Sequence, residues 1–239
     1  MTVPSAPCLV TCEHASREVP ARWRPLFAGH EELLASHRGW DPGSRELGEA
    51  LARRLGCALF VAATSRLLVE LNRSPGHPEL FSELTRGLPE AERTALLEEH
   101  YFPYRHGVET AVAERAAGGG PPCLHLSAHS FTPVWEGRCR EVDVGLLFDP
   151  ARPRETAFCR RWRDLLEHRR PDLAVRFNEP YLGVDDGLTT HLRGRFPDER
   201  YLGIELEVNQ RFPLAGGAAW AALRRDLVEA CDEAARSLA

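Results

Sequence analysis

The stretch that decides the fold reads PPCLHLSAHSFTPVWEGRCREVDVGLLFD and spans residues 121–149. Two apolar runs in it flank a polar loop, a pattern typical of two buried strands. His129 lies where the first run ends, and His125 shares its strand face. Ligands of open α/β sheets gather at the carboxyl ends of strands. His129 is therefore a candidate metal ligand or base, whereas we expect His125 to be a buried structural residue.

Outward from this stretch, short apolar runs and longer amphipathic segments alternate along the chain. The runs predict further strands at 7–12, 57–62, 66–71, 173–177 and 201–208. The segments predict helices at 45–55, 90–99, 104–117, 154–167 and 218–238, with a break or kink at Pro103. This alternation favours an α/β fold in which helices cover a mainly parallel sheet. No linker interrupts it, so we expect one domain over residues 1–239.

Composition excludes several classes of protein. The net charge of −5 gives no electrostatic footprint for nucleic acid. No apolar run approaches the ~20 residues that span a bilayer, and no signal peptide is apparent, so no membrane partner is expected. The seven cysteines are scattered without a Cys-x-x-Cys pair, which favours reduced thiols and a cytoplasmic location. The sequence leaves the oligomeric state open.

Two further candidates for a site lie near predicted element ends. His14 follows the run 7–12, so it takes the same kind of strand-edge position as His129. Asp41 precedes a proline, which biases it toward an extended backbone at a boundary. Each has a plainer interpretation: His14 as a hydrogen-bonded edge histidine, and Asp41 as a turn or capping carboxylate.

Charged residues also mark two of the predicted strands. Glu205 and Glu207 share one face of the alternating run 201–208, where two carboxylates need solvent, a cation or a chemical role. Arg66 and Arg73 bracket another run, and a guanidinium matches a carboxylate bidentately. The alternatives are a solvated strand face for the glutamates and ordinary surface charge for the arginines.

Together these residues suggest metal-dependent hydrolysis. Catalytic zinc sites use three nitrogen or oxygen ligands, and a nearby carboxylate can move the proton of the attacking water. Two histidines, one aspartate and one further glutamate make up the smallest such set. Motifs of helical zinc proteases, of phosphate-binding loops and of Gly-x-Ser-x-Gly hydrolases are absent.

The chain resembles the N-formylglutamate amidohydrolase family. The matching segments are EHAS at 13–16, WD at 40–41, SRLLVELNR at 65–73, YFPY at 101–104, SAHS at 127–130, TH at 190–191 and ELE at 205–207. The resemblance implies an α/β fold like that of the zinc-dependent exopeptidases, with three layers and a central mixed, mostly parallel sheet. It also implies a divalent metal, with zinc as the first candidate. The implied substrate is a small acidic N-acyl amino acid.

The resemblance further implies roles for individual residues. The metal ligands would be His14, Asp41 and His129. Glu207 would be the general base, and His191 would stabilise the developing oxyanion. The side chains that hold a substrate carboxylate would be Arg66, Asn72 and Arg73.

Three positions depart from the family's pattern. Asp41 and Ser127 stand where typical members have His and Asp, and Glu70 stands where they have Asp. Loss of the acid at 127 would remove a carboxylate that orients a metal-binding histidine, which can lower metal affinity ~10–100-fold. Two functions therefore compete: a hydrolase of N-formyl or N-acyl amino acids with an acidic or polar side chain, and a degenerate member that binds a small carboxylate without turnover.

Overall fold

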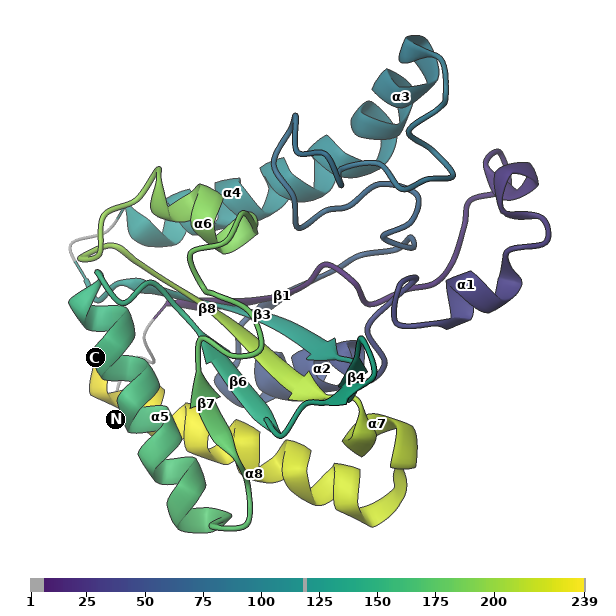
Figure 1. Cartoon of the computed structure of the whole chain (residues 1–239). Helices are drawn as coiled ribbons and strands as arrows, with labels where there is room; N and C mark the ends of the chain where they lie inside the picture. Colours follow the sequence, from purple (N-terminus) through teal and green to yellow (C-terminus); the bar gives the residue numbers. More distant parts are fainter. Residues whose placement is uncertain (1–6, 118–119, 239) are drawn as a thin grey trace.

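A six-stranded sheet forms the centre of the computed structural model, which describes residues 7–117 and 120–238 (Figure 1). Its strands, in spatial order, are β2 (Ala58–Val61), β1 (Cys8–Cys12), β3 (Cys123–Phe131), β8 (Tyr201–Asn209), β6 (Val144–Leu147) and β7 (Val175–Phe177). The first four run parallel. Strand β6 is antiparallel to β8 and parallel to β7, so the sheet is mixed but mostly parallel.

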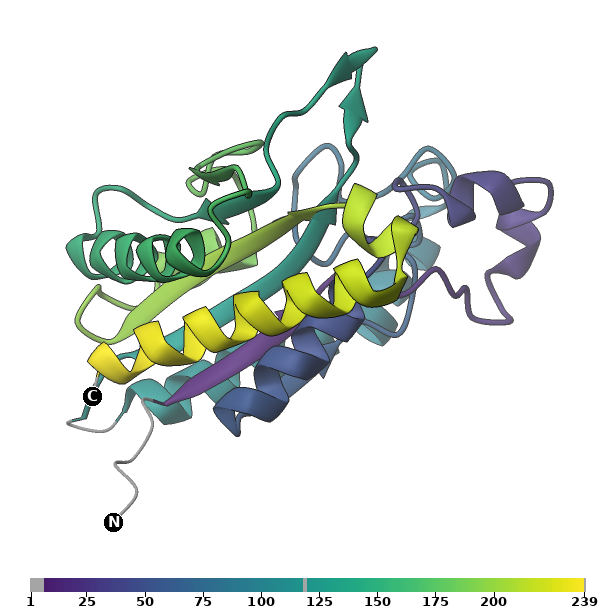
Figure 2. The ribbon, with the colours of Figure 1, turned by 90° about the horizontal axis from the view of Figure 1, so that it is seen from below.

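Helices cover both faces of this sheet (Figures 1 and 2). One face packs against α2 (Ser44–Leu55), α5 (Pro153–Arg169) and α8 (Gly217–Ala235). The other packs against α4 (Phe102–Ala116) and α6 (Leu188–Arg193). The predicted fold class, a mostly parallel mixed sheet between two helical layers, is confirmed.

The two central strands divide their side chains between these faces because successive residues of a strand point to opposite sides. Even-numbered residues of β3 and β8 pack into the main core: Leu124, Leu126, Ala128, Leu202, Ile204, Leu206 and Val208. The opposite face carries polar side chains: His125, Ser127, His129, Glu205 and Glu207. The apolar face holds the α2–α5–α8 layer. On the other face, Cys123 and Tyr201 at the strand starts pack with α4 and α6, and the polar side chains follow further along both strands.

The strand predicted at 66–71 is wrong. These residues form a buried turn-rich segment, in which the Glu70 amide donates to the carbonyl of Leu80 at 2.9 Å. Leu68 packs with side chains near α3, whereas Val69 packs in another cluster with Tyr101. An apolar run predicts burial but not sheet pairing, and here the burial is provided by loops and helices.

The predicted break near Pro103 appears as a π-helical turn. Helix α3 (Glu90–Leu96) continues through the turn Leu97–Tyr101 into α4, so the chain stays helical from 90 to 116. Pro103 then lies in the first turn of α4, where its missing N–H is tolerated. The remaining short elements are Arg24–Phe27, α1 (Glu31–Ala35), β4 (Val134–Trp135), β5 (Arg138–Cys139), α7 (Arg211–Ala215) and Arg236–Leu238. Among the described helices, none has both the length and the apolar character required to cross a bilayer.

His125 is a buried structural residue, as expected. It is fully buried on β3, its Nε2 lies 2.8 Å from the Thr11 hydroxyl, and its Nδ1 lies 2.7 Å from the Tyr201 hydroxyl. A neutral ring with one donor and one acceptor satisfies both contacts. Burial lowers the pKa of His125 to about 4.

We predict that His125 contributes to acid sensitivity of the fold. The unfolded ring titrates near ~6.5, so between that pH and about 4 the unfolded state binds the extra proton and stability falls as pH falls. At pH 4.5 the loss is about 2–3 kcal/mol. Urea unfolding at pH 7.0 and 4.5 measures how far the free energy of unfolding falls between these pH values. In His125→Asn this fall should be smaller than in the wild type by that amount. The exposed His168→Asn should keep the wild-type difference; equal differences in all three proteins would contradict the assignment.

Candidate metal centre

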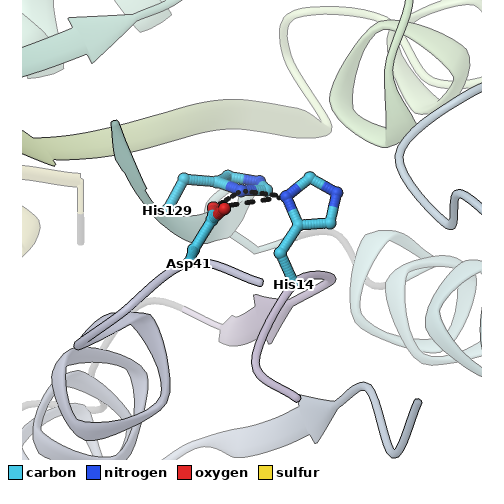
Figure 3. A group of neighbouring side chains, drawn as sticks. All are labelled: His14, Asp41 and His129. Atoms are coloured by element: carbon cyan, nitrogen blue, oxygen red, sulfur yellow. Dashed lines mark hydrogen bonds and ion pairs between the residues drawn. The ribbon is translucent and has the colours of Figure 1, made fainter. Parts of the chain in front are cut away.

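Three buried side chains from distant segments meet at one point (Figure 3). The Nδ1 atoms of His14 and His129 lie 3.1 Å apart. Asp41 Oδ2 lies 3.2 Å from the first nitrogen and 3.0 Å from the second. These three atoms form a nearly equilateral triangle, the arrangement in which three ligands can share one small cation.

The parallel sheet brings the two histidines together. His14 directly follows β1 and His129 lies near the end of β3, and neighbouring parallel strands end at the same edge. Asp41 lies between α1 and α2, and its amide donates to the His14 carbonyl at 2.9 Å. The amide of Ser130 donates to Asp41 Oδ2 at 3.3 Å, which fixes that oxygen toward the rings.

The outer nitrogen of each ring faces a carboxylate. His14 Nε2 lies 2.5 Å from Glu70 Oε1. His129 Nε2 lies 3.2 Å from Glu13 Oε2 and 2.8 Å from the hydroxyl of Ser127, which donates to Glu13. A carboxylate at this position keeps the proton on Nε2, so the Nδ1 lone pairs point at the centre. Carboxylate–histidine–metal sites use the same arrangement.

The buried cluster carries several ionised carboxylates, and their negative charge favours a nearby positive charge. Burial would raise the pKa values of Glu13, Asp41 and Glu70, but neighbouring imidazoles and Arg66 outweigh it and hold all three carboxyls well below their usual range. Burial would likewise lower the pKa of His129, yet Asp41 and Glu13 hold it well above its usual value. In the absence of a metal, a proton on His129 offsets part of this negative charge. When both rings are neutral, as metal ligation requires, the three buried carboxylates exceed the single guanidinium of Arg66 by two charges, so the donor set fits a divalent cation.

Glu207 stands beside this centre. It pairs in register with His129 across β3 and β8, so both side chains lie on the same face of the sheet. Its Oε2 is buried and has no hydrogen-bond partner among the residues that the structure describes. Burial raises the pKa of Glu207 to about 8. A carboxyl with a pKa near neutrality is suited to exchange protons with a reacting group.

The centre opens into a cleft of about 600 Å³. Seven of the eight predicted site residues line it: His14, Asp41, Arg66, Asn72, Arg73, His129 and Glu207. His191 does not, within the described part of the chain. It lies on α6 with Nε2 3.5 Å from Glu109 Oε2 on α4, so the structure does not bring it together with the other seven.

Arg66 belongs to the centre itself. Its Nε donates to Glu70 Oε2 at 2.6 Å, and its Nη1 lies 3.5 Å from Asp41 Oδ1. One guanidinium therefore supports a carboxylate on each side of His14. Arg66 also lines the cleft.

Asn72 and Arg73 line the cleft next to the centre, because the amide of Asn72 donates to Glu70 Oε1 at 3.0 Å. Arg73 Nη1 donates to the carbonyls of Asn72 and Asp186, at 3.1 and 2.7 Å. Asn72 Oδ1 accepts from the amide of Leu188 at 2.7 Å. Asn72 thus fixes the start of α6, and Arg73 remains about one quarter exposed at the cleft.

Two important carboxylates were given no role from the sequence. Glu13 precedes His14 in the EHAS segment, and strand alternation would send adjacent side chains to opposite faces. The chain has left β1 at this point, however, and both residues reach the same cluster. For Glu70 the sequence indicates only a departure from the family's pattern, in a segment predicted to be a strand. The contact that a carboxylate at 127 was expected to provide comes from Glu13.

Comparison with known proteins identifies the family of this chain. The family model for N-formylglutamate amidohydrolase matches residues 6–213. The chain belongs to the N-formylglutamate amidohydrolase family. The crystal structure of gene product Atu2144 from Agrobacterium tumefaciens superposes with a TM-score of 0.79 at 30% identity, covering 98% of this chain and 92% of that chain.

A metallo-carboxypeptidase from Burkholderia cenocepacia aligns at 14% identity with a TM-score of 0.44, over 100% of this chain and 59% of that chain. No curated protein matches the sequence. The three positions expected to depart from the family's pattern, Asp41, Glu70 and Ser127, are all buried in the cluster. They keep the cluster acidic because Glu13 supplies the carboxylate that Ser127 lacks.

We predict that Glu13 matters more than Ser127 for metal affinity. Glu13→Gln keeps the shape but removes the charge that faces His129, so zinc affinity should fall about 10–100-fold. Ser127→Ala removes only a neutral hydroxyl and should cost clearly less. Competition against a chromophoric chelator measures both affinities. Equal losses, or no loss in Glu13→Gln, would contradict the role given to Glu13.

Proposed function

We propose that this family member is a zinc-dependent hydrolase that cleaves the amide bond of an N-formyl or N-acyl amino acid with an acidic side chain. One observation carries the proposal: two imidazole nitrogens and a carboxylate oxygen lie within 3.2 Å of one another, in a cleft of an amidohydrolase-family chain. The unpartnered carboxyl of Glu207 next to them supports it.

His14, Asp41 and His129 are the residues that would hold the ion, and two nitrogens with one oxygen suit zinc. A bound divalent ion would acidify a water molecule and polarise the amide carbonyl of the substrate. Glu13 and Glu70 hold the two rings in the required tautomer. Three protein ligands are the number that catalytic zinc sites use, and these three line the cleft in which a substrate would bind.

Glu207 would move the proton. As a carboxylate it takes a proton from the attacking water, and as a carboxylic acid it delivers that proton to the leaving amine nitrogen. A carboxyl that is buried and lacks a fixed partner can do both, because no hydrogen bond locks it in one charge state. The products are the free acid of the acyl group and the free amino acid.

Arg73 would hold a carboxylate of the amino-acid part, and Arg66 would assist while it also supports Asp41 and Glu70. Guanidinium groups bind carboxylates by charge-assisted hydrogen bonds. The oxyanion role implied for His191 draws no support from its position beside Glu109, so we do not include it in this proposal.

The same geometry weakens the alternative of a degenerate binding protein. That alternative rests on Asp41 and Ser127 as damaged positions. Asp41 directs an oxygen at both histidines, and Glu13 supplies a carboxylate beside Ser127. Protein that takes up no zinc on titration, yet is stabilised against heat by an acidic amino acid, would favour the alternative.

Glu207→Gln should lower kcat about 10²–10⁴-fold while metal content stays normal, because the amide cannot accept the proton of water. Glu205→Gln is the matched control on the same strand face; its carboxylate accepts from the Thr189 hydroxyl at 2.7 Å and should matter far less. Steady-state kinetics with N-formylglutamate or another N-acylglutamate measures both. Unchanged hydrolysis in Glu207→Gln would show that the assigned mechanism is wrong.

Arg73→Met should raise KM for an N-acylglutamate about 10–100-fold with a smaller change in kcat, since a charge-assisted contact to the bound substrate is lost. Arg66→Met should lower zinc affinity as well, because Arg66 bonds to Glu70 and Asp41. Kinetics combined with metal analysis separates the two arginines. A KM that is unaffected by Arg73→Met would remove Arg73 from the substrate site.

A further inference from the structure

Apolar side chains are exposed mainly at one place, the mouth of the cleft. Within residues 7–117 and 120–238, six large hydrophobic side chains remain exposed. Five of them are Val134 and Trp135 of strand β4, and Tyr181, Leu182 and Val184 of the loop 178–187. Exposed apolar groups gathered at one site usually indicate binding. Trp135, Tyr181 and Leu182 also line the cleft, and we call these three the apolar rim.

Arg140 joins the two parts of this rim. Its guanidinium lies 5.3 Å from the ring centre of Trp135, 5.0 Å from that of Tyr181 and 5.6 Å from that of Phe131. Its Nη1 also donates to the Tyr181 hydroxyl at 3.1 Å. Cation–π contacts of this kind hold rings at defined positions. The hairpin β4–β5 and the loop 178–187 therefore form one surface along the cleft.

The loop 178–187 is held firmly against the sheet. A Cβ atom at Gly145 would lie 2.1 Å from the carbonyl oxygen of Glu179, and one at Gly183 would lie 2.1 Å from the amide nitrogen of Phe148. Asn178 Oδ1 accepts from the amides of Phe148 and Gly183, both at 3.0 Å. Exposure of Tyr181 and Leu182 thus comes from a packed backbone, so these two members of the rim are in position before a ligand binds.

The two ends of this loop differ in chemistry. Tyr181 lies at the aromatic end beside Arg140, whereas Asp186 lies at the charged end, where its carbonyl accepts from Arg73 and its carboxylate accepts from Ser74. Arg73, at the charged end, suits a carboxylate of the amino-acid part of a substrate, whereas Arg140 is engaged with the rings and the Tyr181 hydroxyl of the aromatic end. The part that remains for the aromatic end is the acyl group.

A formyl group does not match such a surface. It has one carbon and can cover almost none of the rim. The cleft of about 600 Å³ is in the range that takes drug-sized ligands, well beyond what a one-carbon acyl group needs. Apolar surface contributes to binding only when it is covered.

We propose that the substrate of this chain carries a bulky apolar acyl group, of about the size of a benzene ring, which lies on Trp135, Tyr181 and Leu182. This proposal rests on the proposed function and adds the acyl specificity to it. The substrate class is then an N-aroyl or similarly bulky N-acyl derivative of an acidic amino acid. Its hydrolysis consumes one water and releases the aromatic acid and the free amino acid.

The test compares N-benzoylglutamate with N-formylglutamate on the zinc-loaded full chain, with release of glutamate as the readout. The wild type should have the higher kcat/KM for the benzoyl substrate. Trp135→Ala should lower the ratio of the two kcat/KM values, benzoyl over formyl, about 10–30-fold, the effect of uncovering one aromatic face. The matched control is Val134→Ala, because Val134 is 46% exposed beside Trp135 at 49% but does not line the cleft. It should leave the ratio unchanged.

Isothermal titration with both compounds, on the Glu207→Gln background, gives a second readout that does not require turnover. If the benzoyl compound binds more tightly than the formyl compound, and Trp135→Ala weakens that binding at least tenfold, the rim is supported as the site of the acyl group. This holds even if neither compound is hydrolysed, and in that case only the proposed function fails. Hydrolysis with a preference for the formyl compound, or a ratio that Trp135→Ala leaves unchanged, overturns the rim and leaves the proposed function standing. If neither compound binds, both the acyl-group proposal and the proposed function are overturned. A rim that serves only to contact another protein would give that result.

Discussion

The active centre depends on two imidazole nitrogens that face each other at 3.1 Å among buried carboxylates. Two lone pairs at that distance repel each other, and Asp41 beside them adds negative charge, so only a proton or a cation makes the arrangement favourable. Glu13 and Glu70 keep protons on the outer nitrogens and so keep the inner lone pairs free. The cluster is therefore best understood as a cation site whose geometry is fixed by hydrogen bonds one layer further out.

The sheet makes this costly arrangement possible by separating two environments across one layer. Leucines on the even positions of β3 and β8 anchor the α2–α5–α8 layer, and that burial stabilises the fold. Polar side chains on the odd positions then share the other face without competing for the core. His125 lies on the same polar face as His129 but deeper, where hydroxyls of Thr11 and Tyr201 satisfy it as a neutral ring. Depth along one strand thus separates a structural histidine from a metal-facing one.

Much of this could be predicted from sequence because it follows from local periodicity. The alternation at 201–208 and the placement of His14 and His129 after apolar runs predict the sheet and its polar edge. The strand prediction for 66–71 is wrong because an apolar run indicates that residues are buried but does not indicate which element they pack against. The role of Glu13 could not be predicted for a different reason. Its partner His129 is more than a hundred residues away in the sequence, and the turn after β1 ends the strand alternation that would predict which way the Glu13 side chain points. Contacts between loops are set by the assembled fold, and no local pattern records them.

The loop 178–187 links the chemistry of the site to its specificity. Gly145 lies opposite Glu207 on the neighbouring strand, and its missing Cβ lets the backbone of Glu179 cross directly above. Glu207 is buried beside this crossing, and burial raises the pKa of its carboxyl to about 8. The same crossing sets the course of the chain two residues later, where Tyr181 turns toward Arg140. A side chain at 145 would therefore disturb the proton-transfer group and the apolar rim together, so the basicity of Glu207 and the shape of the acyl subsite are physically coupled through one glycine.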